Sequence, residues 1–367
     1  MNRFFCCWLI VASGLWVNSS LAATVTFLSP GPATDNYWAA YAKFMQVAAE
    51  RLGMSLTVLY SERDTRALLN LARESLQGPV RPDYLVFSNE LNVAPEILRL
   101  SQGSGVKLFL VNNTLTASQM EIIGDVSSRY PDLIGSLIGN DEEGGYLIAS
   151  QLMSLHPPLA EGETVEMLAF SGTTSTPVSV RRENGLYRAL AEHPEVHLRQ
   201  IVLGGWRRDR ALEQARVLLK RYPDVKLIWA ASDQMAYGAM DAVRELGKLP
   251  GKDVLFATIN GTPEALKAQA EGELNVLAVG HIMIGGWAMV LLHDYDHARP
   301  GARHNLGPRQ VRVLKLMNAR DTAGLVEASK RADRGIDVRD YSLQGSEDSA
   351  EKPFSPIKLA KRSALAK

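Results

Sequence analysis

A loop near the start of the chain combines aromatic rings with hydrogen-bonding side chains. Segment 29–38 is rich in turn-forming residues and ends in Asn36, Tyr37 and Trp38. Flat rings beside a few polar groups suit a small polar ligand with apolar faces, such as a sugar or a cyclic polyol. The loop lacks the glycine patterns of a dinucleotide site or a P-loop, so we expect no cofactor of these kinds. The alternative for Tyr37 and Trp38 is a place in the core of the helix that follows.

Two adjacent amides and two adjacent arginines are further candidates. Asn112 and Asn113 offer donors and acceptors together, although asparagine is also common in ordinary turns. Arg181 and Arg182 fall in the first turns of a predicted helix, where a positive charge is mildly unfavourable and needs a partner. A ligand hydroxyl or carboxylate would serve, because a guanidinium can bind it through two donors. The alternative for both arginines is a salt bridge with a nearby carboxylate of the protein.

Other predicted strands also end in polar or aromatic residues. Trp206 follows two glycines, Ser232 and Asp233 follow an apolar run, and Asn260 and His281 come after the last two runs. We predict that Asp233 accepts a hydrogen bond from a ligand hydroxyl. If Asp233 instead caps the helix that begins near residue 234, Ser232 would be the member of the pair that faces the ligand.

Several kinds of catalytic site are not supported. The sequence contains neither the HExxH motif of zinc hydrolases nor the GxSxG motif of serine hydrolases. The adjacent carboxylates Glu142 and Glu143 lie in a predicted helix and fit a solvated face. A single histidine such as His281 is more often a hydrogen-bonding residue than a catalyst. We therefore expect a protein that is not an enzyme and that has no metal site.

The N-terminus predicts export. Arg3 precedes an apolar stretch from residue 4 to 17 that is short for a membrane span, and small residues follow it at positions 20–22. This pattern is typical of a signal peptide, and we predict cleavage after Ala22 and a periplasmic protein. An uncleaved anchor is the alternative. Cys6 and Cys7 are the two cysteines of the chain, so the exported part would contain no thiol and no disulfide.

Composition and charge are those of an ordinary globular protein. The chain has 367 residues, of which 46% are hydrophobic, with 40 basic and 40 acidic side chains. A net charge of zero argues against a nucleic-acid partner held by a diffuse basic surface. The length suggests about two domains, each with its own core.

Short apolar strands alternate with helical segments along most of the chain. Trp38, Tyr41 and Met45 recur at helical spacing after a potential N-cap at Asp35. The predicted strands are 24–28, 56–60, 84–87, 107–111, 164–170, 199–203, 225–230, 253–259 and 275–279, and the predicted helices are 36–52, 65–77, 142–155, 178–192, 209–221, 234–246 and 263–271. Such alternation predicts an α/β fold with doubly wound parallel sheets, whose ligands bind at the carboxyl ends of the strands. The prolines at 157 and 158 separate two such sets, so we expect two similar lobes.

Three segments carry a resemblance to a known family. YPDVKLIWAASDQMAYGAM at 222–240 resembles the PDVxAIFAxNDxMAxGA stretch of type I periplasmic binding proteins of the ribose- and galactose-binding group. INGTPEAL at 259–266 is similar to the DGTPEAL turn of that group, and VRRENG at 180–185 to its RxxG helix start. The resemblance covers roughly residues 24–315.

The resemblance implies a lobe organisation. It implies two doubly wound lobes joined by three crossing segments, near Asn140, His281 and Arg309, that act as a hinge. The expected divisions are a signal peptide at 1–22, an N-terminal lobe of 23–139 plus 282–309, and a C-terminal lobe of 140–281 plus 310–343. A polar tail at 344–367 completes the chain, and its composition predicts poor order.

The resemblance also implies a ligand site and partners. The family places ligand contacts at positions that correspond here to Asn36, Tyr37, Trp38, Asn112, Asn113, Arg182, Trp206, Ser232, Asn260 and His281, and Asp233 stands beside them. Asn112 and Asn113 replace an Asp-Arg pair of sugar binders, and Asn260 replaces an Asp, so the charged clamp for a simple pyranose or furanose is weaker here. The expected function is capture of a sugar-like ligand for an ABC-type importer, without a cofactor. The Tyr-Trp pair also resembles the autoinducer-binding branch, so a sensor subunit that docks on a membrane histidine kinase is the alternative.

Overall fold

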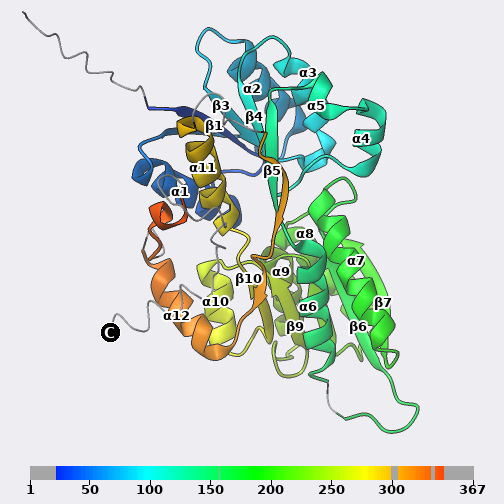
Figure 1. Ribbon diagram of the computed structural model, residues 1–367. Helices are drawn as coiled ribbons and strands as arrows, with labels where there is room; N and C mark the ends of the chain where they lie inside the picture. Colours follow the sequence, from blue (N-terminus) through cyan, green and yellow to red (C-terminus); the bar gives the residue numbers. More distant parts are fainter. Residues whose placement is uncertain (1–21, 157, 299–304, 332–334, 343–367) are drawn as a thin grey trace, which may run out of the picture.

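The computed structural model describes residues 22–156, 158–298, 305–331 and 335–342. It contains two six-stranded sheets, one above the other in Figure 1, with helices on both faces. The predicted α/β architecture of two similar parallel-sheet lobes is therefore confirmed. The predicted signal peptide, apart from Ala22, and the predicted tail lie outside the described residues. None of the helices within those four ranges has the length and the apolar run needed to cross a bilayer.

The first lobe is built on a sheet in which every pair of neighbouring strands is parallel. The strand order is β11-β5-β4-β3-β1-β2. Its central strand β3 is apolar and buried at every position, as expected when helices cover both faces. The elements of this lobe are β1 Thr24–Ser29, α1 Asn36–Arg51, β2 Ser55–Tyr60, α2 Thr65–Gln77, β3 Tyr84–Phe87, η1 Glu90–Asn92, α3 Ala94–Ser101, β4 Lys107–Val111, α4 Ala117–Ile123, α5 Val126–Arg129, β5 Leu133–Gly139, α11 Met283–His297 and β11 Gly307–Val311.

The second lobe repeats this plan, with the strand order β12-β10-β9-β8-β6-β7. All its pairs are parallel except that of the short edge strand β12 with β10. Its elements are α6 Asp141–Met153, β6 Val165–Ser171, α7 Pro177–Glu192, β7 Val196–Leu203, α8 Arg208–Arg221, β8 Leu227–Ala230, α9 Asp233–Glu245, β9 Leu255–Ile259, α10 Pro263–Ala270, β10 Val276–Val279, β12 Lys315–Leu316 and α12 Ala319–Ser329.

Between β5 and β12 the described chain crosses from one lobe to the other three times, and hydrogen bonds and close contacts tie these three crossings together. The chain passes from β5 to α6 at Asn140, from β10 to α11 around His281, and from β11 to β12 through residues 312–314. The Asn140 side chain accepts from the backbone nitrogen of Leu314 at 2.9 Å. A Cβ on Gly280 would lie 1.9 Å from the Val313 oxygen, so the second and third crossings are in direct backbone contact.

Two of the expected segment boundaries differ from the structure. Arg309 lies inside β11 of the first sheet, so the third crossing comes after Val311 and not at Arg309. The short helix η3, Val338–Tyr341, packs against α11 and α1, although segment 310–343 was expected in the second lobe. The chain therefore returns to the first lobe after α12.

Every predicted strand and helix is present, and two of the elements that were missed, α11 and β5, have identifiable reasons. Helix α11 is apolar on nearly all sides, so it shows no amphipathic period. Strand β5 contains Gly135, at a φ of 155°, which packs against the backbone of Gly307 in β11. Glycine weakens the β pattern in a sequence, but here it permits this close approach of two strands.

Helices α6 and α7 of the second lobe approach each other at two glycines. A Cβ on Gly145 would lie 2.2 Å from the backbone oxygen of Arg182, and a Cβ on Gly185 would lie 2.1 Å from that of Glu142. Contacts this short leave no room for a methyl group. The two glycines therefore set the distance at which side chains of α7 meet those of α6.

We predict that Gly185→Ala destabilises the protein by about 1–3 kcal/mol, because the new methyl group must push α7 away from α6. Urea unfolding followed by circular dichroism measures this loss. Asn184→Ala, at the exposed neighbouring position on α7, is the matched control and should change stability by less than about 0.5 kcal/mol. Equal stability of the two variants would contradict the close-packing argument.

Candidate functional site

A cavity lies between the two lobes, at the carboxyl ends of their strands. Asn36 and Arg181 are the two candidates from the sequence that do not line it; the others do, namely Tyr37, Trp38, Asn112, Asn113, Arg182, Trp206, Ser232, Asp233, Asn260 and His281. Asn36, as the first residue of α1, lines an adjoining groove outside the cavity.

Six lining residues were not foreseen: Asp35, Arg63, Glu90, Thr176, Val178 and Gln234. Asp35 was expected only as a helix cap, and it does accept from the backbone nitrogens of Tyr37 and Trp38 at 3.0 Å each. Its other oxygen pairs with Arg63 at 2.6 Å. Gln234 could have been found, since it directly follows two predicted residues, whereas nothing in the local sequence marks Arg63 or Glu90.

Trp38 serves the core and the cavity at once, so the two alternatives drawn from the sequence do not exclude each other. Its side chain is 5% exposed and packs against Phe27 and Tyr41, while it also lines the cavity. Gly31 makes room for the indole, because a Cβ there would lie 2.2 Å from the ring. The ring of Tyr37 stands edge-on to that of Trp38, with 5.0 Å between centroids.

Arg182 is held by a carboxylate of the protein, which is the alternative that the sequence left open. Its Nε donates to Asp141 Oδ1 at 3.0 Å, and its Nη1 donates to the backbone oxygen of Ala231 at 2.6 Å. Both side chains of the pair are almost fully buried. Burial alone would raise the pKa of Asp141, but His281 and Arg182 hold it well below its usual range. Asp141, which no sequence pattern singled out, therefore fixes the guanidinium at the cavity wall.

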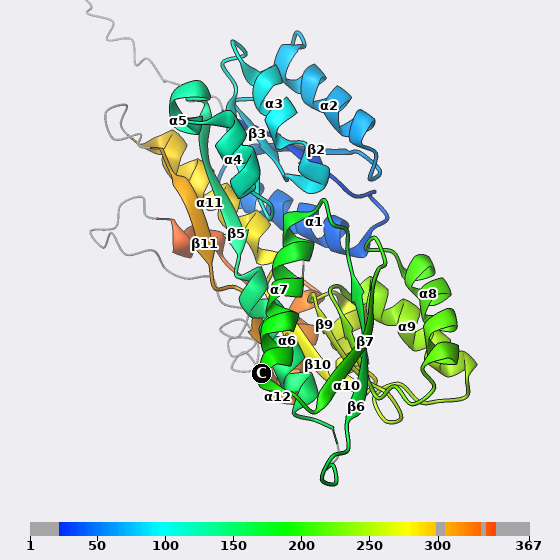
Figure 2. The same cartoon turned by 90° about the vertical axis from the view of Figure 1, so that its right-hand side faces the viewer.

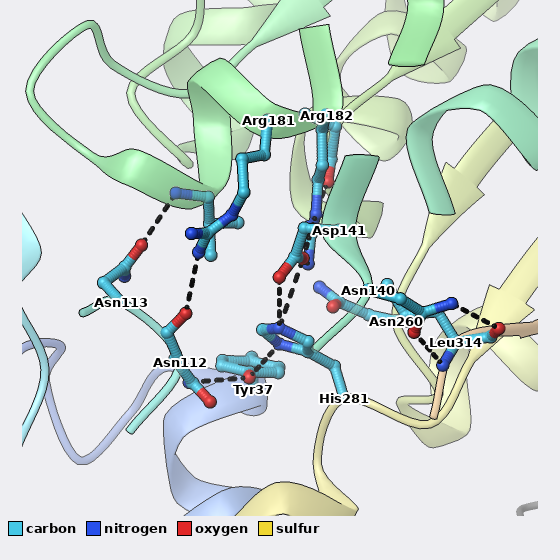
Figure 3. Close-up of polar contacts among 12 residues, drawn as sticks. Tyr37, Asn112, Asn113, Asn140, Asp141, Arg181, Arg182, Asn260, His281 and Leu314 are labelled. Atoms are coloured by element: carbon cyan, nitrogen blue, oxygen red, sulfur yellow. Dashed lines mark hydrogen bonds and ion pairs between the residues drawn. The ribbon is translucent and has the colours of Figure 1, made fainter. Parts of the chain in front are cut away.

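A chain of hydrogen bonds runs from the first lobe through the hinge to this ion pair (Figure 3). Asn112 Nδ2 donates to the Tyr37 hydroxyl at 3.1 Å, and that hydroxyl lies 2.5 Å from His281 Nδ1. His281 Nε2 lies 3.3 Å from Asp141 Oδ1. Burial lowers the pKa of His281, although Asp141 opposes the shift, and this favours the neutral ring. A neutral ring with its proton on Nε2 satisfies both neighbours, since Tyr37 then donates to Nδ1.

Asp233 is the first residue of α9 and not its cap, which is Ser232. Its Oδ1 accepts from Asn260 Nδ2 at 3.0 Å, and its Oδ2 accepts from the Thr262 hydroxyl at 2.5 Å. Burial raises the pKa of Asp233 to about 6, in spite of these donors. Each carboxylate oxygen can accept two hydrogen bonds, so Oδ2 retains capacity for one more donor.

Trp206 is placed by an unusual backbone. Its φ is 65°, a left-handed conformation that is uncommon for a bulky residue, and Gly205 before it is also left-handed. The indole lies directly over Gly172, where a Cβ would come within 2.1 Å of the ring. The turn after β7 therefore directs this ring toward the cavity. Figure 2 shows the ends of β6 and β7 below α1, the helix that carries Trp38.

Four buried polar atoms of the cavity wall have no hydrogen-bond partner within the described residues. They are Asn112 Oδ1, Trp206 Nε1, Ser232 Oγ and Gln234 Nε2. Burying a polar group without a partner costs about 1–3 kcal/mol, so such groups at a cavity point to a ligand that pairs with them. The first lobe contributes the Asn112 oxygen, and the second lobe contributes the other three atoms.

The described part of the chain holds no cluster of three or more His, Cys, Asp and Glu side chains that could bind a metal ion. Glu142 and Glu143, which were predicted on a solvated face, are 47% and 39% exposed. The cavity wall therefore offers hydrogen bonds, aromatic faces, two arginines paired with carboxylates, and the carboxyl groups of Glu90 and Asp233, which bond to neutral donors.

Comparison with known proteins agrees with this architecture. The family model described as a periplasmic binding protein domain matches residues 25–296. A crystal structure of a periplasmic sugar-binding protein from Pseudomonas fluorescens is 45% identical, with a TM-score of 0.83 over 93% of this chain and 100% of the other. The galactofuranose-binding protein YtfQ of Escherichia coli is 22% identical over 260 residues, which are 70% of this chain and 77% of YtfQ. The D-allose-binding periplasmic protein of Escherichia coli is 24% identical over 300 residues, 81% of this chain and 92% of that protein.

The family match covers most of both lobes and every residue of the cavity wall. The relative at 45% identity aligns along its entire length, so the likeness is not confined to the common α/β pattern. The chain therefore belongs to the periplasmic binding protein family, within the type I group with ribose- and galactose-binding members that the sequence motifs indicated.

Proposed function

We propose that this protein binds a neutral, monosaccharide-sized sugar between its two lobes and delivers it to an ABC-type importer. The observation that carries the proposal is the set of four unpartnered polar atoms in the cavity wall. Asn112 Oδ1 accepts, Trp206 Nε1 and Gln234 Nε2 donate, and Ser232 Oγ can do either. Sugar hydroxyls both donate and accept, so one ring with several hydroxyls can satisfy all four atoms.

The aromatic residues and the charges of the cavity support the same ligand class. The indoles of Trp38 and Trp206 offer apolar faces, which suit the C–H faces of a sugar ring. The two lining arginines are each paired with a carboxylate, Arg63 with Asp35 and Arg182 with Asp141. Because their charges are already balanced, the cavity favours a neutral sugar over a sugar acid or a sugar phosphate.

Ligand contacts from both lobes would favour the closed form, since a ligand shifts a conformational equilibrium by its difference in affinity for the two states. The importer as partner is supported by relatives such as the ribose import binding protein RbsB of Escherichia coli, which is 23% identical over 230 residues. The relatives named here are not described as sensor subunits, so we propose the importer and not the histidine kinase. Two of the relatives, the D-allose-binding protein and the Pseudomonas fluorescens protein, are described as periplasmic, and together with the N-terminal pattern this supports export by a signal peptide at 1–22. The relatives are described as binding proteins, which supports a binding role without catalysis.

We predict that isothermal titration with D-ribose, D-allose, a galactofuranoside and myo-inositol finds at least one that binds with a Kd in the micromolar range or below. Gln234→Leu should weaken the binding of that sugar about tenfold, because the substitution removes a hydrogen-bond donor from the cavity wall. Gln102→Leu, at an exposed glutamine far from the cavity, is the matched control and should bind as the wild type does. Binding of galacturonate or glucose 6-phosphate in preference to every neutral sugar would refute the proposal.

Arg182 substitution is expected to affect stability as well as binding. Arg182→Ala should lower the free energy of unfolding by about 3 kcal/mol, because Asp141 would remain as a buried carboxylate without its partner. The double variant with Asp141→Asn should recover part of this loss, since the buried charge is then removed. Thermal unfolding of the single and double variants measures both effects, and an additive loss in the double variant would argue against this pairing.

We predict that the affinity for the sugar depends on pH through the ionisation of Asp233. If Asp233 Oδ2 accepts a sugar hydroxyl, binding favours the ionised carboxylate and lowers its pKa from about 6 in the free protein. Affinity should then be constant above about pH 7 and fall as the pH decreases through 6 to 5. Asp233→Asn should weaken binding and flatten this profile in the same titrations. A wild-type affinity that rises on acidification would show that the hydroxyl contact is not made.

A further inference from the structure

The N-terminus of helix α7, in the second lobe, contacts the first lobe, and a side chain of the first lobe caps this helix. Thr176 occupies the N-cap position but makes no side-chain cap bond within the described residues, and Pro177 follows it. The backbone nitrogen of Val178 instead donates to Asn113 Oδ1, in the loop after β4, at 2.7 Å (Figure 3). A helix N-terminus in one lobe therefore receives its cap from a side chain of the other lobe.

Asn113 is oriented for this role, and both polar atoms of its side chain already have a hydrogen-bond partner in the protein. Its Nδ2 donates to the Ser88 hydroxyl at 3.0 Å, and this bond turns Oδ1 toward α7. The residue is 2% exposed. The sequence proposed Asn113 as a ligand contact together with Asn112, but only Asn112 has an unpartnered side-chain atom at the cavity.

A second contact lies beside the cap. Arg181, in the second turn of α7, donates from Nη2 to the backbone oxygen of Asn112 at 3.2 Å. Asn112 has a φ of 62°, and this left-handed turn presents its carbonyl to α7 while its side chain bonds to Tyr37. In Figure 3 the two dashed contacts from Asn112 and Asn113 run side by side to α7. Neither contact involves an atom of a ligand.

We propose that Asn113 and Arg181 form a latch that holds part of the ligand-free protein closed and thereby sets its affinity for the sugar. Opening the lobes removes the cap of α7 and the partner of the Arg181 guanidinium, so the latch shifts the equilibrium toward the closed form. Affinity rises with the closed fraction, because the closed form is the one that binds. The effect on affinity rests on the proposed function, whereas the effect on the ligand-free equilibrium does not. Asn113 and Arg181 are thus positioning residues.

The direct test is the distance between the lobes without ligand. Spin labels on Val80→Cys and Val217→Cys, which replace exposed residues of the first and second lobes, report this distance by pulsed electron resonance. The exported protein is expected to lack Cys6 and Cys7, so labelling would be specific. We expect a closed population in the labelled wild type, and a closed-to-open ratio about tenfold lower in Asn113→Leu. The matched control is Asn184→Ala on the exposed face of α7, which should leave the distribution unchanged.

Circular dichroism will show whether Asn113→Leu folds correctly. Variants of Arg181 test the latch independently of that substitution. Arg181→Ala should lower the closed-to-open ratio, and Arg181→Lys should restore part of it, because lysine can still donate to the Asn112 carbonyl. The proposal is overturned if the wild type shows no closed population without ligand, or if Asn113→Leu and Arg181→Ala both leave the distance distribution unchanged. A protein that binds none of the tested sugars could still show these changes in the distance distribution. Failure of the latch proposal can therefore be distinguished from failure of the sugar proposal.

Discussion

The buried ion pair between Asp141 and Arg182 is the interaction on which the cavity depends. It stands where α6 leaves the first crossing and where α7 approaches α6 through Gly145 and Gly185. His281 of the second crossing contacts the same carboxylate, and Tyr37 links His281 to the first lobe. A buried charge without its partner would lower the stability of the fold, so Asp141 and Arg182 each depend on the presence of the other. The hinge, the second lobe and one wall of the cavity are therefore positioned by one polar network.

The same network accounts for the character of the cavity. The positive charges of Arg182 and Arg63 are already balanced by the carboxylates of Asp141 and Asp35. The two arginines therefore add directed hydrogen-bond donors to the cavity more than they add net charge. In the proposed complex, recognition then falls to the amides of Asn112 and Gln234, a hydroxyl, two indoles and the carboxylate of Asp233. This is consistent with the replacement of the charged pair of other sugar binders by two amides at positions 112 and 113.

Much of the fold and most of the cavity wall could be predicted from the sequence, for a physical reason. In parallel sheets the side chains after each strand converge, so residues such as Trp206 and Asn260 could be assigned to one site without knowledge of their contacts. Partners distant in sequence could not be found in this way. Asp141 resembled its solvated neighbour Glu142, and Glu90 follows a predicted strand but carries no motif. The interlobe role of Asn113 was hidden because an amide after a strand is equally suited to a ligand and to a helix N-terminus.

The most direct measurement of the central claim is a crystal structure of the protein with the tightest-binding neutral sugar. The account predicts one sugar ring enclosed between the lobes, with its hydroxyls within hydrogen-bond distance of Asn112 Oδ1, Ser232 Oγ, Gln234 Nε2 and Trp206 Nε1. A sugar bound outside this cavity, or one within it that leaves these four atoms without partners, would contradict the account.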